Sequence, residues 1–489
     1  MAFTTMSFLF VFLPLTILGY YLIHPKLKNL FLLAASLAFY AWGEPKFILI
    51  FMVSIAANYT IALLINKLEN RVDLKRLVLI IALFANVGLL FYYKYLMFAV
   101  TTVNQVFGRN ISIPNIALPL GISFFTFRSI SYILDVYWGT SEAQKNPINA
   151  ALYISFFPQV SMGPITKSYA FLPQLSERGF HFDKFSDGIR RFILGMAKKL
   201  IIADVLSIIV NPIFALPHDE RTVIAAWCGV IGYILQLFFD FSGYSDMAIG
   251  IGKMFGFDTP ENFDYPYMSK GIGEFWGRWH ITLGAWLKDY IYTPIFRALL
   301  DKKKPVFWCD IFGLLCVWLI AGVWHGAAWH YVAYGLYYFL FIALERTVDY
   351  YKKERRKKLK LKKQPETKVE VVLAHIYFVI VLIFGQLLFR VDTLGNYIPY
   401  IRTMFGFGGN QFTNQFTNFT LRSSAGLFFI GILFCFPIGK KVKSILEKNK
   451  YLNSFSEYLV QPIAYLALFI VSISYMLIST SNPFLYFNF

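Results

Sequence analysis

Long apolar runs recur along this chain of 489 residues, and polar positions gather between them. A membrane-spanning helix needs about 20 mostly apolar residues to cross the hydrocarbon layer. Uncharged runs that reach or approach this length lie at 1–23, 47–66, 146–166, 222–239 and 458–489. They are continuous, whereas strands of a membrane β-barrel alternate apolar and polar positions. The pattern therefore predicts an all-α polytopic membrane protein.

Basic residues set the predicted orientation of the spans. The net charge is +18, and Lys and Arg cluster at 67–76, 302–304, 346–364 and 440–450. Such clusters mark the cytoplasmic loops of membrane proteins, so no nucleic-acid partner is expected. The cluster at 346–364 also suits anionic groups of membrane lipids.

With the basic loops inside, both termini lie on the extracytoplasmic side. The predicted spans are 6–23, 30–43, 47–65, 77–93, 371–389, 424–438 and 460–480, and the loop 390–423 is external. The four cysteines form no CxxC pair, so neither a disulfide framework nor a zinc cluster is expected.

The middle third of the chain has a different pattern. Between about 115 and 330, Pro, Gly and isolated charges interrupt the apolar runs. Irregular backbone at membrane depth is tolerated only where it is buried in protein or lines a wet cavity. This pattern predicts a protein-lined cavity, with ordinary spans packed around it.

His325 lies inside a stretch without Lys, Arg, Asp or Glu, at 311–344. One straight helix of that length would measure about 51 Å, and basic residues flank both ends. We therefore expect a broken or re-entrant helix pair, too short for two full spans, with His325 near its midpoint at membrane depth. An ionisable residue there is a functional candidate, and the alternative is a histidine satisfied by a nearby carbonyl. His330 is five positions away, which does not fit paired metal ligands.

His280 lies in the polar segment EFWGRWHITLGAWLKDY, residues 274–290. On one continuous helix Trp276, His280 and Gly284 would share a face. Glu274 and Arg278 have the spacing of an ion pair within a helix, and the alternative for Arg278 is a substrate phosphate or carboxylate. Two neutral histidines without a paired carboxylate motif or GxSxG favour general-base catalysis on a hydroxyl, as in acyl transfer.

Five blocks in order, 118–139, 154–165, 240–257, 261–295 and 321–335, resemble the signature blocks of the membrane-bound O-acyltransferase (MBOAT) family. The nearest branch in appearance is the bacterial alginate O-acetylase group, with the teichoic acid D-alanyl transfer protein as a more distant relative. The resemblance implies a ring of about 11–13 transmembrane or re-entrant helices around a central funnel. The expected division is N-terminal helices at 1–114, a catalytic core at 115–346, a basic cytoplasmic loop at 347–370 and C-terminal helices at 371–489.

The resemblance also implies roles for individual residues. His325 matches the family's catalytic histidine, and His280 matches a second catalytic position that many eukaryotic members fill with Asn. His325 would be the general base, and His280 would orient the thioester carbonyl or stabilise its developing charge. Substrate contacts are expected from Trp276, Arg278, Trp279, Trp324, Asp246 and Asp289, and no metal site is expected. After KDYIYTPI this chain reads FRALLDKKK, where alginate acetylases have a Gly-Gly-Asn-Arg turn.

The expected function is that of an acyltransferase in the bacterial cytoplasmic membrane. It would move an acyl group, with acetyl as the favoured choice, to an extracytoplasmic hydroxyl of a cell-surface or exported polysaccharide. The donor would be acetyl-CoA or an acyl carrier protein thioester, with no bound cofactor and with a secreted SGNH-hydrolase-like partner. One alternative is acylation of teichoic acid, lipid or protein. The alternative of another class is a multi-span transporter, which would not consume a thioester.

Overall fold

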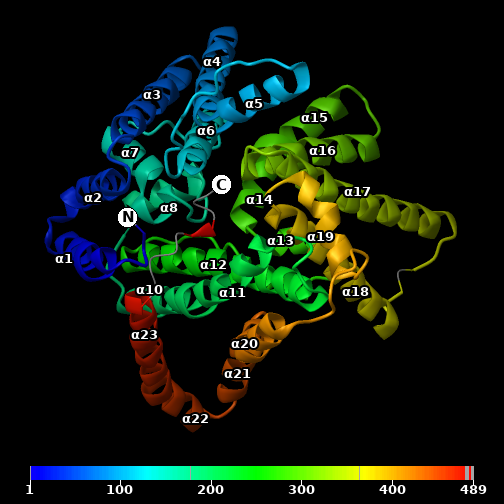
Figure 1. The fold of residues 1–489 in the computed structure, drawn as a ribbon. Helices are drawn as coiled ribbons and strands as arrows, with labels where there is room; N and C mark the ends of the chain where they lie inside the picture. The colour runs from blue at the N-terminus through cyan, green and yellow to red at the C-terminus, as the bar shows by residue number, and fades with distance from the viewer. Residues whose placement is uncertain (1, 177, 363, 479–483, 486–489) are drawn as a thin grey trace. The chain divides into compact units, whose positions relative to one another are not determined.

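The computed structural model describes residues 2–176, 178–362, 364–478, 484 and 485, and across them it is helical without a β-sheet (Figure 1). Seven helical segments among these residues are long and apolar enough to cross a membrane. They are Ile48–Lys67, Val72–Phe107, Val223–Met254, Val306–His325, Lys368–Arg390, Gln415–Phe434 and Lys450–Ile478. The predicted all-α polytopic membrane fold is confirmed.

The chain forms two compact units. The first comprises 1–196, 243–261 and 471–489, and the second comprises 197–242 and 262–470. Helix α12 (Val223–Met254) contributes residues to both units. The four ranges expected from the sequence group residues by role rather than by compactness, and they stay a prediction.

Helices of the first unit come mainly from the N-terminal part of the chain. They are η1 (Phe8–Phe12), α1 (Leu13–Leu22), η2 (Pro25–Leu27), α2 (Lys28–Gly43), α3 (Ile48–Lys67), α4 (Val72–Leu90), η3 (Phe91–Tyr95), α5 (Leu96–Phe107), α6 (Ile122–Trp138), α7 (Pro147–Ser155), α8 (Phe157–Val160), α9 (Ser168–Phe171), η4 (Pro173–Leu175) and α10 (Phe182–Ala197). Helices α3, α4 and α6 pack against one another (Figure 1).

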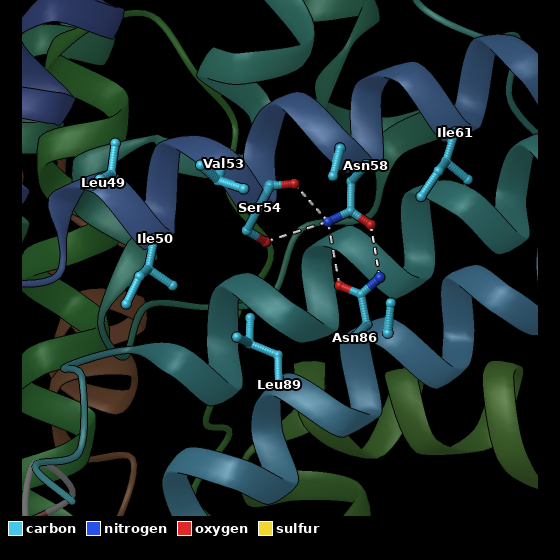
Figure 2. A pocket seen from close by; sticks show the side chains of 10 residues that line it. Leu49, Ile50, Val53, Ser54, Asn58, Ile61, Asn86 and Leu89 are labelled. Carbon is cyan, nitrogen blue, oxygen red and sulfur yellow. Dashed lines mark hydrogen bonds between the residues drawn. The ribbon is translucent and has the colours of Figure 1, made fainter.

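A pair of buried amides joins α3 to α4 in this unit. Asn86 Nδ2 donates to Asn58 Oδ1 over 2.8 Å, and Asn58 Nδ2 donates back over 3.3 Å. The two side chains lie in a largely apolar pocket of about 320 Å³, lined by Leu49, Val53 and Leu89 among others (Figure 2). Interhelical hydrogen bonds of this kind hold helices together in lipid, where burial of apolar surface gives no driving force.

The remaining helices belong to the second unit, except that α23 also contributes residues to the first. They are η5 (Lys198–Ala203), α11 (Asp204–Ala215), the first part of α12, η6 (Pro266–Met268), α13 (Ile272–Arg278), α14 (Ile281–Leu287), η7 (Lys288–Tyr292), α15 (Thr293–Asp301), α16 (Val306–His325), α17 (Trp329–Lys358), α18 (Lys368–Arg390), η8 (Leu394–Asn396), α19 (Tyr397–Met404), α20 (Gln415–Phe434), α21 (Ile438–Leu446), α22 (Lys450–Phe455), η9 (Ser456–Val460) and α23 (Gln461–Ile478).

A buried ion triple ties three elements of the second unit together. Lys199 Nζ lies 2.7 Å from a carboxylate oxygen of Asp204 and 2.7 Å from one of Asp240. These residues belong to η5, α11 and α12, respectively. Buried charges are tolerated when they are paired in this way, because an unpaired charge there would cost several kcal/mol.

The helix break predicted within 311–344 is confirmed. Helix α16 ends at His325 and α17 begins at Trp329, after an extended backbone at Gly326 and Ala328. The two helices pack closely because Gly322 faces Gly335. A Cβ atom at Gly322 would lie only 2.6 Å from the Tyr331 carbonyl oxygen.

The predicted lengths of these two helices were wrong. Helix α16 begins at Val306 and has 20 residues, so it measures about 30 Å, enough to cross the hydrocarbon layer. Helix α17 continues through the charged residues to Lys358. His325 therefore lies at the far end of α16 from Lys302–Lys304, and not at the midpoint of a short re-entrant pair.

The predicted limits of the span at 424–438 and of the loop before it also differ from the structure. Helix α20 begins nine residues earlier, at Gln415, and α19 lies within the range expected to be loop. Asn414 Oδ1 accepts a hydrogen bond from the Thr417 N–H over 2.8 Å. This N-cap stabilises a helix start in a polar segment that hydropathy assigns to the loop.

Candidate active site

His280 lies at a sharp break between two short helices. Helix α13 ends at Arg278, Trp279 is extended, and α14 begins at Ile281. His280 itself adopts the left-handed conformation, with φ 46° and ψ 50°. The prediction that Trp276, His280 and Gly284 share one face of a continuous helix is therefore wrong. A non-glycine residue held in this conformation costs of order 1–3 kcal/mol, and such residues cluster at active sites.

A short antiparallel pairing holds this break in place. The Ile281 N–H donates to the Asn262 carbonyl, and the Asp264 N–H donates to the Arg278 carbonyl, both over 3.0 Å. Phe263 and Trp279 form the isolated β-bridge between these two hydrogen bonds. The backbone around His280 is thus fixed by a partner segment earlier in the chain, and not by helix propensity.

The Asn262 side chain determines the protonation of the His280 ring. Its Oδ1 atom lies 3.1 Å from His280 Nδ1 and also accepts hydrogen bonds from the Thr282 N–H and hydroxyl, over 3.2 and 2.9 Å. An amide oxygen only accepts, so Nδ1 carries the hydrogen and Nε2 keeps its lone pair. Sequence reasoning missed Asn262, whose only signal was its place inside the block 261–295.

Burial keeps the His280 ring neutral. The side chain lies outside the candidate spans, is 2% exposed and packs edge-on against Phe241 at 4.6 Å between ring centroids. Burial lowers the pKa of the imidazole to about 3 because the charged form loses its hydration. At neutral pH the ring therefore offers a hydrogen-bond acceptor at Nε2.

His325 is enclosed by aromatic side chains from three helices. It is 4% exposed, and its ring lies edge-on to Tyr334 of α17 at 5.5 Å and to Phe389 of α18 at 5.0 Å. The adjacent Trp324 of α16 contacts the same ring at 4.8 Å. This enclosure leaves little of the imidazole exposed and holds it at the broken end of α16.

The Trp324 indole contacts both histidines. Its centroid is 5.9 Å from that of His280 and 4.8 Å from that of His325. The structure thus brings together two histidines 45 positions apart, and it places Trp324 against both. Trp276 belongs to the same aromatic cluster, 6.4 Å from Tyr334.

The structure places the other predicted substrate contacts against neighbouring protein side chains or on a helical turn. Trp279 is buried and stacks on Phe275 at 5.6 Å. Arg278 pairs with Glu274 at 2.9 Å, which is the ion pair that their spacing predicted. Asp289 is half-buried on the π-helical turn η7. Direct substrate contacts by Trp276, Arg278, Trp279, Trp324 and Asp289 stay a prediction.

Asp246 lies in the first unit and not with the two histidines in the second. It accepts a hydrogen bond from Arg191 Nε over 3.0 Å, and Arg191 also pairs with Glu261. Its role as a substrate contact stays a prediction. Among the described residues no group of three or more His, Cys, Asp or Glu side chains is arranged to hold a metal ion.

Replacing Asn262 with alanine is expected to destabilise the protein and slow its reaction. The Thr282 N–H and the His280 Nδ1–H would lose their buried acceptor, which costs about 1–3 kcal/mol. Thermal unfolding in detergent and the single-turnover rate measure the two effects. Asn86→Ala is the matched control, because it also removes one of two bonded buried amides. Equal loss of rate per folded molecule in both variants would contradict the role of Asn262.

Comparisons with known proteins identify the family. A family model described as MBOAT, membrane-bound O-acyltransferase family, matches residues 144–354. The chain is 37% identical over 415 residues to the probable alginate O-acetylase AlgI of Pseudomonas putida. The aligned region covers 84% of this chain and 81% of that protein. The chain is also 35% identical over 383 residues to a peptidoglycan O-acetyltransferase of Helicobacter pylori, covering 71% of each. A teichoic acid D-alanyltransferase of Bacillus subtilis is 33% identical over 228 residues, covering 45% of this chain and 56% of that protein.

The matched region of the family model contains His280 and His325 together with Asn262 and Trp324. The similarity to alginate O-acetylases extends over most of both chains. The chain belongs to the membrane-bound O-acyltransferase family.

Proposed function

We propose that this O-acyltransferase moves an acetyl group from a cytoplasmic thioester to a hydroxyl group of an extracytoplasmic polysaccharide. Two of the relatives named above support acetyl as the group and a polysaccharide as the acceptor, since they are a probable alginate O-acetylase and a peptidoglycan O-acetyltransferase. The observation that carries the proposal is the pair of buried histidines on one indole. Two buried imidazoles side by side suit proton transfer from a hydroxyl.

In the proposed reaction His325 is the general base. It takes the proton of the acceptor hydroxyl as the oxygen attacks the thioester carbon. The carbon–sulfur bond then breaks, and the proton passes from the imidazolium to the leaving thiolate. The products are an ester and a free thiol, so no further reactant is needed.

His280 has a narrower role in this proposal than the sequence suggested. With Nδ1–H donated to Asn262, the neutral ring accepts a hydrogen bond at Nε2 and has no N–H to offer a developing oxyanion. We assign it the orientation of a substrate N–H or O–H group. Oriented binding of a reacting group accounts for a large part of many rate enhancements.

The acyl donor approaches a strongly basic surface in this proposal. The last turn of α17 carries Arg355, Arg356, Lys357 and Lys358. Exposed charges attract phosphate groups or an acidic carrier protein across about 10 Å at 0.1 M salt. The donor KM is expected to rise several-fold between low and high ionic strength, with a smaller change in kcat. A donor KM independent of salt would contradict charge steering.

The function is tested with the purified protein in nanodiscs. Labelled acetyl-CoA, and separately an acetylated acyl carrier protein, are incubated alone, with an oligosaccharide acceptor, and with a secreted hydrolase-fold protein. Thioester loss that leaves the label on the oligosaccharide supports the proposal. Transfer to a secreted hydrolase-fold protein alone would indicate a relay through its serine. No loss of either thioester, with a monodisperse protein, would overturn the proposal.

A further inference from the structure

A carboxylate far along the chain caps the short helix that leads to His280. Glu345 of α17 accepts hydrogen bonds from the Ile272 N–H over 2.6 Å and from the Gly273 N–H over 2.8 Å. These are the first two residues of α13, and the N-cap residue Gly271 has no side chain to cap them. The first N–H groups of a helix lack intrahelical partners, so an outside acceptor satisfies them.

Helix α13 depends on such contacts because it has only seven residues. Isolated helices shorter than about 12 residues are marginal in water. Its C-terminal end is held by the hydrogen bond from the Trp279 N–H to the Phe275 carbonyl, at 2.8 Å. Only Trp279 separates α13 from His280, so we expect a shift of α13 to move the His280 ring.

The two glycines at the start of α13 make room for the carboxylate. A Cβ atom at Gly271 would lie 3.1 Å from Glu345 Oε1, and one at Gly273 would lie 3.3 Å from Oε2. Both distances are tighter than ordinary contacts, so a side chain at either position would displace the carboxylate.

The segment before α13 has further ties. The His375 ring of α18 bonds the Ser269 carbonyl through Nδ1 at 3.1 Å, and Lys270 pairs with Glu366 at 2.8 Å. The Lys270–Glu366 pair is exposed, and such pairs contribute little. Glu345 differs from them in accepting hydrogen bonds from N–H groups of α13 itself.

We propose that Glu345 is a positioning residue for acyl transfer: it fixes the N-terminus of α13 and thereby the place of the His280 ring. This proposal rests on the proposed function. Glu345 does not touch the reacting atoms, and it acts through the six residues, 274–279, between its hydrogen bonds and His280.

Kinetics of Glu345→Ala and Glu345→Gln test the proposal. Glu345→Ala is expected to lower kcat by about 10- to 100-fold with little change in the donor KM, since small misplacements of reacting groups have effects of this size. Glu345→Gln keeps one acceptor oxygen and should fall between. Gly273→Ala reaches the same contact from the other side and should lower kcat with Glu345 intact.

The matched control is Glu370→Ala. Glu370 also accepts a hydrogen bond from a backbone N–H at a helix start, from Thr367 over 2.7 Å, but that helix, α18, does not lead to His280. The control should lose no more than about twofold in kcat, because a surface helix cap affects stability and not the site.

A double-mutant cycle separates positioning from a general structural role. In a His280→Ala background, Glu345→Ala should lower the rate by less than about twofold, since its effect passes through the missing ring. An equal loss in both backgrounds would overturn the proposal.

Hydrogen–deuterium exchange gives a readout independent of activity. Amides of residues 272–282 should exchange faster in Glu345→Ala than in the wild type or in Glu370→Ala. Unchanged exchange there would overturn the positioning role even if the wild type showed no transferase activity. Wild-type inactivity with faster exchange in Glu345→Ala would instead overturn the proposed function alone.

Discussion

Replacing His325 with alanine is expected to lower the single-turnover rate of thioester consumption by about 10²–10⁴-fold, the usual contribution of a general base. The side chain is buried among Trp324, Tyr334 and Phe389. None of these three side chains can accept a proton at neutral pH in place of His325. The rate is measured with labelled acetyl-CoA and protein in nanodiscs.

The matched control for this experiment is His330→Ala. His330 is also a buried histidine on the α16–α17 hairpin, and its ring packs on Tyr331 at 4.0 Å. This variant shares the loss of a buried imidazole and should stay within a few-fold of the wild-type rate. Full activity of a monodisperse His325→Ala protein would show that another group is the base.

Replacing His280 with alanine is expected to lower the transfer rate by about 10²-fold, because the substrate loses the acceptor that orients it. His280→Asn should retain more activity, since the asparagine amide also offers an acceptor oxygen. Single-turnover rates of the three proteins, with folded protein measured by size-exclusion chromatography, give the order. Equal rates for His280→Ala and His280→Asn would contradict the hydrogen-bonding role.

The pH dependence of transfer provides a second test of His280. Its pKa is lowered to about 3, so the ring is neutral throughout pH 5–8 and does not titrate there. The rate profile of His280→Asn should therefore have the same shape as that of the wild type over this range. A change in its acid limb would show that His280 gains a proton during the reaction.

Continuous apolar runs were enough to predict the all-helical fold, because spanning length and composition are local properties. The break after His325 was predictable for the same reason: glycines and a charge-free stretch too long for one helix. The length of α16 was not, because the helix includes Val306–Asp310, which lie outside the charge-free run used to define it. Similarly, the start of α20 depends on an N-cap that hydropathy does not see.

The site near His280 was only partly predictable. The segment 274–290 marked it by its polar residues, but the conformation of His280 depends on pairing with 262–264. The local sequence RWHIT, residues 278–282, does not predict a helix break, since it contains neither glycine nor proline. Asn262 and Glu345 act from 18 positions before His280 and from 65 positions after it, and no periodicity connects contacts of that kind.

The left-handed backbone conformation at His280 restricts the residue types that this position tolerates. β-Branched and bulky side chains are strongly disfavoured there, whereas Asn, Asp and His are several-fold enriched among non-glycine residues of this conformation. Of that small set, His and Asn both offer a neutral hydrogen-bond acceptor. Backbone geometry and chemistry therefore admit nearly the same residues, so an exchange between His and Asn requires no new turn. A lineage could change the residue that contacts the substrate and keep the fold around it intact.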